Sequence, residues 1–287
     1  MNTRGAGTAR PHLFPRSRPR ATESPAGLPR LTLRRARSWT ISGVRSATNR
    51  LGIDRLPCHC AGSWTSIPTH YWYGLSFRYE PAVYQTLKAE LKRGDTFFDV
   101  GAHFGIWSRV AHQIVGPEGS VVAFEPSPAY SRLEGYMGKT QARLENVAIG
   151  SELGEAVFFA QGAATTGSLS REVTAINEEF EDGEVSELRV PIQRLDDYCE
   201  EIGITPSLIK IDVEGFELEA LRGAQNLLET RRPKLVIEVH PPQLELSGGS
   251  EAALFEHLES AGYSSQVIDQ NENSLFTILC LPDAFSA

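Results

Sequence analysis

The stretch Thr96-Phe97-Phe98-Asp99-Val100-Gly101-Ala102-His103-Phe104-Gly105 joins a short apolar run to an acid and a glycine-containing turn. The run predicts a buried strand, because strands covered on both faces of a sheet are almost continuously apolar. Ile106, Val110, Ala111 and Ile114 then follow at helical spacing. The stretch therefore predicts a strand, a loop and a helix, which is the repeating unit of an α/β sheet.

Apolar runs alternate with helical patterns through the rest of the chain. We expect further strands at 121–124, 147–149, 208–213, 235–239, 265–268 and 276–281. We expect helices at 128–139, 216–228 and 251–261. The segment 154–194 interrupts this alternation with two β-like pieces, at 156–159 and 188–192. The pattern predicts an α/β fold with a doubly wound, mainly parallel, Rossmann-like sheet of about seven strands.

The N-terminal segment, residues 1–50, has the composition of a disordered chain. It holds eleven arginines and one acid, Glu23, among many Pro, Ser, Thr and Gly residues. Three interpretations are open: a solvated tail, a targeting segment, and sequence upstream of the true start. We expect residues 51–79 to form a linker or N-terminal extension and residues 80–287 to form the catalytic domain.

Charge and composition restrict the partners. The formal charge is −8 for the whole chain, so residues 51–287 carry about −18. An acidic body argues against a nucleic-acid partner, because phosphate contacts need clustered Lys and Arg. No apolar run has the length of a membrane span, and Cys58-His59-Cys60 with nearby His70 lacks the paired spacing of a zinc site. We expect a cytoplasmic protein that acts on a small molecule, with no membrane partner and no metal.

The turn after the first strand is the expected ligand site. In doubly wound sheets, ligands bind beyond the carboxyl ends of the strands. Gly101 and Gly105 allow the backbone to approach a ligand closely, and Glu125 ends the second strand, where an acid can accept hydrogen bonds from ribose hydroxyls. A nicotinamide dinucleotide site has similar features, but its second and third glycines would fall at His103 and Ile106. A nucleoside cofactor without phosphates tolerates those side chains.

Six blocks of sequence occur in an order that is known from one family. They are Phe98-Asp99-Val100-Gly101-Ala102-His103-Phe104-Gly105, Phe124-Glu125-Pro126-Ser127-Pro128, Asn146-Val147-Ala148-Ile149-Gly150, Lys210-Ile211-Asp212-Val213-Glu214-Gly215-Phe216-Glu217, Leu221-Arg222-Gly223-Ala224 and Glu238-Val239-His240. Over about residues 80–281 the chain resembles the FkbM-type methyltransferases. The resemblance implies a class I fold that uses S-adenosylmethionine and methylates hydroxyl groups of sugars or other natural products.

The resemblance also implies roles for single residues. Asp99 and the turn 101–105, which includes His103 and Gly105, would hold the methionine part of the cofactor. Glu125 would hold the ribose, and Asn146 and Ala148 would lie near the adenine. Asn146 can equally be a turn residue before a short strand. The sequence departs from the family at His103, where Asn is common, and we expect the backbone of either residue to serve.

An alcohol acceptor has to lose a proton, and candidate groups follow the central strands. These are Asp212, Glu214, Glu238 and His240. We expect His240 to be the base, because imidazole titrates near neutral pH, with Glu238 or Asp212 orienting it. Each residue also has a structural interpretation: Asp212 as a helix cap, Glu238 as the partner of a surface Arg, and His240 as a strand terminator. The four would suit a divalent metal ion as well, although nothing in their spacing demands one.

Three functions therefore compete. The first is a methyltransferase that transfers a methyl group from S-adenosylmethionine. The second is an NAD(P)-dependent oxidoreductase, and the third is a noncatalytic domain that binds S-adenosylmethionine. The oligomeric state and the acceptor are left open by the sequence.

Overall fold

The computed structural model describes residues 80–138, 140–160, 167–175, 185–270 and 275–284 in full, and the backbone alone at residues 161, 166 and 176. It also describes the backbone of β1 (Arg55–Cys60) and β2 (Ser63–Pro68), which pair in a separate two-stranded sheet. The expectations for residues 1–50, for the side chains of Cys58, His59 and Cys60, and for His70 lie outside the described residues.

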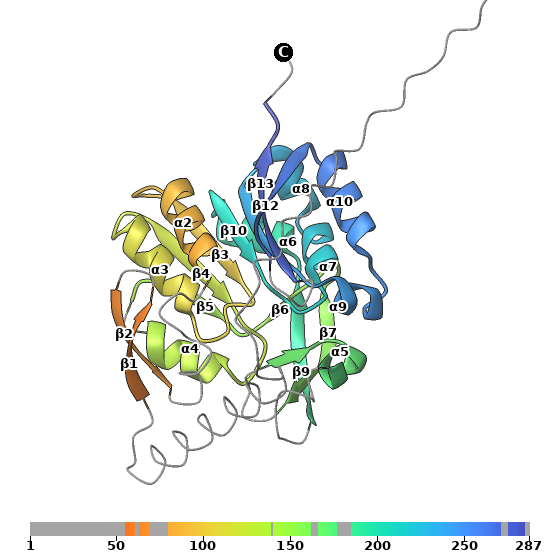
Figure 1. Cartoon of the computed structure of the whole chain (residues 1–287), viewed down its shortest axis with the longest axis horizontal. Helices are drawn as coiled ribbons and strands as arrows, with labels where there is room; N and C mark the ends of the chain where they lie inside the picture. Colours follow the sequence, from red (N-terminus) through yellow and green to blue (C-terminus); the bar gives the residue numbers. More distant parts are fainter. Residues whose placement is uncertain are drawn as a thin grey trace, which may run out of the picture. The chain divides into compact units, whose positions relative to one another are not determined.

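A seven-stranded sheet forms the centre of the region 80–284 (Figure 1). Its strands are β3 (Thr96–Val100), β4 (Ser120–Phe124), β5 (Arg143–Glu145), β10 (Leu208–Ile211), β11 (Lys234–Val239), β12 (Tyr263–Gln270) and β13 (Phe276–Pro282). The order is β12-β13-β11-β10-β3-β4-β5. Five neighbouring strands, β11 to β5, are parallel, and β13 is antiparallel to both β11 and β12. The expected doubly wound, mainly parallel sheet of seven strands is confirmed.

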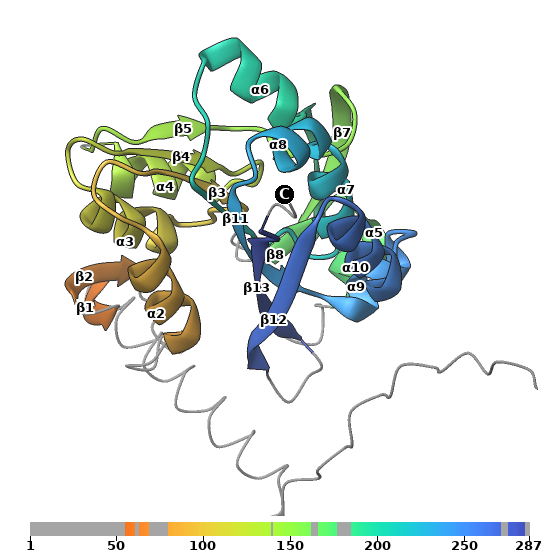
Figure 2. The same cartoon turned by 90° about the horizontal axis from the view of Figure 1, so that it is seen from above.

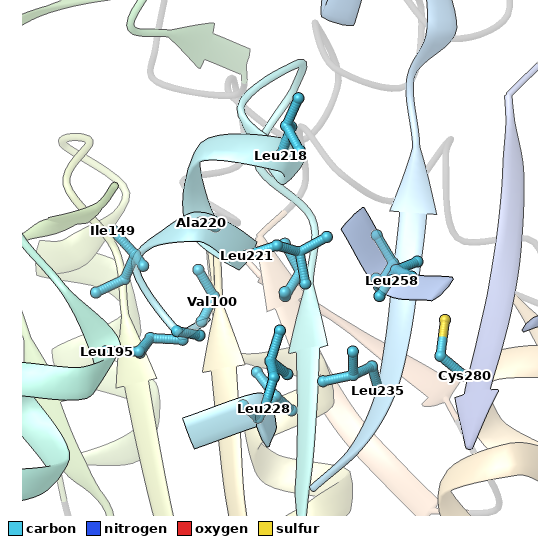
Figure 3. Packing of buried hydrophobic residues seen from close by; sticks show 14 of the residues in the cluster. Val100, Ile149, Leu195, Leu218, Ala220, Leu221, Leu228, Leu235, Leu258 and Cys280 are labelled. Atoms are coloured by element: carbon cyan, nitrogen blue, oxygen red, sulfur yellow. The ribbon is translucent and has the colours of Figure 1, made fainter. Parts of the chain in front are cut away.

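Helices cover both faces of this sheet because alternate residues of the buried strands point to opposite sides. On one face, α2 (Pro81–Glu90) and α3 (Ile106–Val115) pack against Phe97, and α4 (Tyr130–Met137) packs against Ala123. On the other, α6 (Leu195–Ile202), α7 (Glu217–Arg222), α8 (Gln225–Thr230) and α10 (Glu251–Ser260) pack against Phe98 and Val100. Figure 2 shows α2 and α3 on one side and α7, α8 and α10 on the other. In Figure 3 the helix leucines meet Val100 and Leu235 of the sheet.

The inserted segment forms a second sheet of four strands. It contains β6 (Ala148–Ile149), β7 (Gly154–Gln161), β8 (Thr166–Ser168) and β9 (Val185–Gln193). The short helix α5 (Arg171–Ile176) lies between β8 and β9 in the chain and contacts β7 and β8. The strand expected at 147–149 is present as β6, but our placement of it as the third strand of the main sheet was wrong. The third strand is β5, whereas Ala148 pairs with Ile192 of β9. The two β-like pieces of the insert are confirmed as β7 and β9.

The helix expected at 216–228 is two helices, α7 and α8, separated at Gly223. A Cβ at position 223 would collide with the backbone carbonyl of Gly150, so glycine allows the chain segments to cross closely here. The remaining helix, α9 (Pro241–Leu246), starts directly after β11. Among the described helices, none combines the length and the apolar character that crossing a bilayer requires.

Candidate active site

The glycine turn after β3 packs against the end of β10, at the point where the strand order reverses. Gly101 has a left-handed backbone, with φ of 79°, and a Cβ there would collide with the carbonyl oxygen of Asp212. The amides of Gly101 and Ala102 both donate to the carbonyl of Phe124 at 3.0 Å. The turn is therefore fixed between β10 and β4. Ligands bind at this kind of position in doubly wound sheets.

Glu125 lies against this turn. Its Oε2 accepts a hydrogen bond from the amide of His103 at 2.6 Å, and its Oε1 accepts one from the amide of Ser127 at 2.8 Å. The side chain is buried, and burial raises its pKa although the amide hydrogen bonds oppose the shift. The acid after the second strand and the turn after the first are thus brought together.

His103 adopts a left-handed conformation, with φ of 54°. Asn and His are among the non-glycine residues that enter this region most readily. His103 can therefore adopt the backbone conformation that Asn, the common residue at this position in the family, adopts readily. Gly105, with φ of 80°, starts α3, and a Cβ there would lie 2.5 Å from Cδ1 of Leu133.

Asp99 is the penultimate residue of β3, and its two carboxylate oxygens have different surroundings. Its Oδ2 accepts a hydrogen bond from the hydroxyl of Ser108 at 2.5 Å, and its buried Oδ1 has no hydrogen-bond partner among the residues that the structure describes. Burial raises the pKa of this carboxyl, and the charge of Lys210 opposes the shift. A buried acceptor without a donor is costly, so this oxygen suits a ligand that carries N–H groups.

The two residues expected near the adenine lie in different surroundings. Asn146 is exposed and donates from Nδ2 to the carbonyl of Glu125 at 2.8 Å, so it adjoins the turn. Ala148 is buried among Phe158, Ala160 and Val190 in the core of the second sheet. The described contacts of the Ala148 side chain are therefore with the second sheet, and its place near the adenine stays a prediction.

The four candidate catalytic residues come together beyond β10 and β11. Nε2 of His240 lies 3.9 Å from Oδ1 of Asp212 and 3.7 Å from Oε2 of Glu214. Glu238 belongs to the same cluster, since Asp212, Glu238 and His240 offer atoms within 4.8 Å of one another. His240 is only 2% exposed, and the Asp212 and Glu214 side chains are 24% and 30% exposed. The carboxylates of Asp212 and Glu214 are therefore more accessible than the imidazole of His240.

Sequence reasoning assigned no role to two residues of this cluster. Nζ of buried Lys210 lies 2.8 Å from Oδ2 of Asp212. Nδ1 of His240 lies 2.7 Å from Oε1 of Glu217, whose side chain is fully buried. Both residues stand in the block 210–217 that carries the family resemblance. Glu217, as an acid at the start of a helix, has the ordinary explanation of a helix-dipole partner.

These neighbours change the titration of the cluster. Burial lowers the pKa of His240, but the charges of Glu214, Glu217 and Asp212 outweigh it and hold that pKa well above its ordinary range. The charge of Asp212, together with burial, raises the pKa of Glu238 well above its usual value. Burial would also raise the pKa of Asp212, but Lys210 and His240 hold it low. The three carboxylates around the ring therefore shift the pKa of His240 upward from the near-neutral value on which its choice as the base was founded.

Asp212, Glu238 and His240 also have the ligand types that divalent metal ions bind. In this structure the ammonium of Lys210 already compensates the charge of Asp212. The expectation that no metal is needed stays a prediction.

The doubly wound sheet, together with a glycine turn that is hydrogen-bonded to Glu125, is typical of α/β domains that bind ligands at the ends of their strands. A family model described as the methyltransferase FkbM domain matches residues 99–265, more than half of the chain. This chain therefore belongs to the FkbM methyltransferase family.

Two curated relatives are methyltransferases. The 31-O-demethyl-FK506 methyltransferase FkbM of Streptomyces tacrolimicus is 30% identical over 178 residues, which cover 53% of this chain and 67% of that protein. The hexuronic acid methyltransferase AglP of Haloferax volcanii is 25% identical over 218 residues, covering 72% of this chain and 79% of that protein. A crystal structure of methyltransferase FkbM from Methylobacillus flagellatus KT matches with a TM-score of 0.44 and 16% identity, over 65% of this chain and 43% of that one.

Proposed function

We propose that the domain at 80–287 transfers a methyl group from S-adenosylmethionine to a hydroxyl group of a sugar or other natural product. The observation that carries this proposal is the contact between Glu125 and the glycine turn, at 2.6 Å from the amide of His103. Each carboxylate oxygen of Glu125 accepts one amide hydrogen bond, and an ionised carboxylate has about four acceptor sites. Two sites are left for ribose hydroxyls.

A second residue, at the end of the neighbouring strand β3, supports binding of the rest of the cofactor. The unpaired Oδ1 of Asp99 suits the ammonium group of the methionine part. When bound, S-adenosylmethionine supplies a methyl group on a positively charged sulfur. The chain's own residues align the acceptor and exclude water, which are the main contributions to such a reaction. His240, in its neutral form, accepts the hydroxyl proton at Nε2, the nitrogen on the side of Asp212 and Glu214.

The acceptor class is supported by the two curated relatives, whose names state 31-O-demethyl-FK506 and hexuronic acid as substrates. The charge of about −18 over residues 51–287 favours small molecules over nucleic acids as partners. Cys199 and Cys280 are free thiols in the described part of the chain, which fits our proposal of a cytoplasmic location. Recovery of the full chain from the secreted fraction would contradict that location.

Calorimetry tests the cofactor. We expect S-adenosylmethionine and S-adenosylhomocysteine to bind and NAD(P) not to bind. Glu125→Gln should weaken binding by about 10-fold to 100-fold, because it removes charge-assisted hydrogen bonds to the ribose. Glu256→Gln, on the exposed face of α10, is the matched control. Binding of NAD(P) in place of S-adenosylmethionine would overturn the proposal.

Transfer of a labelled methyl group tests the reaction. The panel should contain sugars and natural products with free hydroxyl groups, and amines of similar size. Label on oxygen supports the proposal. Label on nitrogen alone would refute the O-methyl assignment, and binding without any transfer would favour the noncatalytic alternative.

A further inference from the structure

The segment 212–217 folds into a turn that returns its last residue toward β11. Glu214 and Gly215 both have left-handed backbones, with φ of 49° and 97°. A Cβ on Gly215 would lie 2.7 Å from backbone atoms of Gln243, so glycine is needed for this packing. The hydroxyl of Ser168 donates to the carbonyl of Glu214 at 3.1 Å. The turn is thus held from two sides, by α9 and by the second sheet.

This turn places the carboxylate of Glu217 directly beside the ring of His240. Oε1 of Glu217 accepts a hydrogen bond from the amide of Gly215 at 2.9 Å and lies 2.7 Å from Nδ1 of His240. Glu217 is 0% exposed, and no described residue forms a hydrogen bond with its Oε2. Its carboxylate is therefore directed at the imidazole and at the turn, away from solvent.

A role in stability alone explains this pair poorly. Burying a carboxylate costs free energy that its partners only partly return, and buried ion pairs are often no more stabilising than apolar groups of the same size. A fixed carboxylate on one imidazole nitrogen has a definite chemical effect, because it decides which nitrogen carries the proton in the neutral ring. With the proton on Nδ1, Nε2 has a free lone pair on the side of Asp212 and Glu214.

We propose that Glu217 is a positioning residue that holds the neutral His240 ring with its proton on Nδ1 and its basic Nε2 toward the acceptor side of the site. This inference rests on the proposed function for the identity of the reaction. In the reaction, the O–H bond of the acceptor breaks as the Nε2–H bond forms. The resulting imidazolium is balanced by the carboxylate of Glu217. The oxygen keeps the electron pair with which it would bond the methyl carbon, while the carbon–sulfur bond of the bound cofactor would break and leave its electron pair on sulfur.

The test on the wild-type protein is a nitrogen-15 titration of the histidine rings, with His240 assigned by the loss of its signals in His240→Gln. In the neutral ring we expect the proton on Nδ1. The carboxylates that act on this ring are Asp212, Glu214, Glu217 and Glu238, and Lys210 pairs with Asp212. A neutral ring with its proton on Nε2 would overturn the proposal without any change at Glu217.

The variant Glu217→Gln tests whether Glu217 is what fixes the proton position on His240. The amide can donate to Nδ1 and so turn the neutral ring to the Nε2–H form, and it removes one negative charge. We expect the maximal turnover to fall by about 100-fold, the acid limb of the turnover profile to move to lower pH, and the affinity for S-adenosylmethionine to stay within about 3-fold of wild type. Glu217→Asp should recover part of the turnover, because it keeps the acceptor. Glu256→Gln should leave the titration and the turnover unchanged.

The outcomes separate this inference from the proposed function. An unchanged proton position and unchanged acid limb in Glu217→Gln would overturn the positioning role even if methyl transfer is found. Failure of the wild-type protein to bind S-adenosylmethionine would refute the proposed function, while the ring titration would still report on the Glu217–His240 pair.

Discussion

Nζ of Lys210 lies 2.8 Å from Oδ2 of Asp212, and the lysine side chain is 2% exposed. Lys210 lies in β10 and Asp212 follows the strand directly. The two residues are two positions apart, so both side chains point to the same face of the sheet. Burial lowers the pKa of Lys210, but the carboxylates of Asp212 and Asp99 outweigh burial and raise that pKa. The ammonium therefore remains charged and is the internal cation of an acidic cluster.

Lys210→Met should destabilise the fold. The change leaves Asp99 and Asp212 without their buried cation, and removal of one partner from such a pair costs about 3 kcal/mol of unfolding free energy. The deficit should shrink in acid, because the two carboxyls become neutral there. Urea unfolding at several pH values measures both effects. Lys88→Met, on the exposed side of α2, is the control, and equal stability of the two variants would contradict the prediction.

His240 should make stability depend on pH. Its pKa in the folded protein lies well above the ordinary value of 6.5, so its pairing contributes fully below about pH 6.5 and is lost as the pH rises through the folded-state pKa. His240→Gln should therefore cost about 3 kcal/mol near pH 6, and the cost should fall as the pH rises through the folded-state pKa of His240. The comparison is urea unfolding of the variant, the wild type and His112→Gln. A deficit that grows with pH would show that the ring is neutral in the folded protein.

The same shift sets the direction of the turnover profile. A base must lose its proton before it can accept one, so turnover should rise with pH and the acid limb should lie above pH 6.5. His240→Ala should lower turnover by about 100-fold, with cofactor affinity largely kept. His112→Ala is the matched control. Unchanged turnover in His240→Ala would remove His240 from the role of base.

The centre of the main sheet could be predicted from the sequence because β3, β4, β10 and β11 are buried on both faces and appear as nearly continuous apolar runs. The contact between Glu125 and the turn could be anticipated for the same reason, since parallel strands that follow one another place their ends together. The strand at 147–149 was misplaced because two short candidates, 143–145 and 148–149, lie side by side in the sequence. Only the pairing of Ala148 with distant Ile192 decides between them.

The pKa shifts in the site could not be predicted from the sequence, because they depend on contacts between residues that are far apart in the chain. Glu217 meets His240 across 23 residues, and this depends on two successive left-handed residues in the turn. An acid in the first turn of a helix is common on helix-dipole grounds alone, so its pattern gives no sign of a buried partner. The titration of His240 could not be predicted until three carboxylates were located around it.

Removal of metal should leave the reaction intact. Although Asp212, Glu238 and His240 are suitable ligands, Lys210 already neutralises Asp212. Turnover of the protein after dialysis against a chelator should stay within about 2-fold of the untreated protein, a difference too small to reflect a lost catalytic group. Loss of turnover that is restored by Mg²⁺, Mn²⁺ or Zn²⁺ would contradict this and would assign the cluster to a metal ion.

Two glycines offer a matched pair for the geometry of the turn. Gly101 has a left-handed backbone, and a Cβ there would collide with the carbonyl of Asp212. Gly135 lies on the exposed side of α4, where a Cβ would meet no atom within 4 Å. Gly101→Ala should cost at least about 2 kcal/mol of unfolding free energy, because a non-glycine residue in this conformation is strained and the contact forces β3 and β10 apart.

Gly135→Ala should instead raise the unfolding free energy by about 0.5–1 kcal/mol, since alanine restricts the unfolded chain and favours the helix. Calorimetry with S-adenosylmethionine gives a second measurement. Binding should be lost or strongly weakened in Gly101→Ala and unchanged in Gly135→Ala, because only the first change moves the amides that join the turn to Phe124 and Glu125. If Gly101→Ala bound the cofactor as well as the wild type, the turn would not be part of the cofactor site.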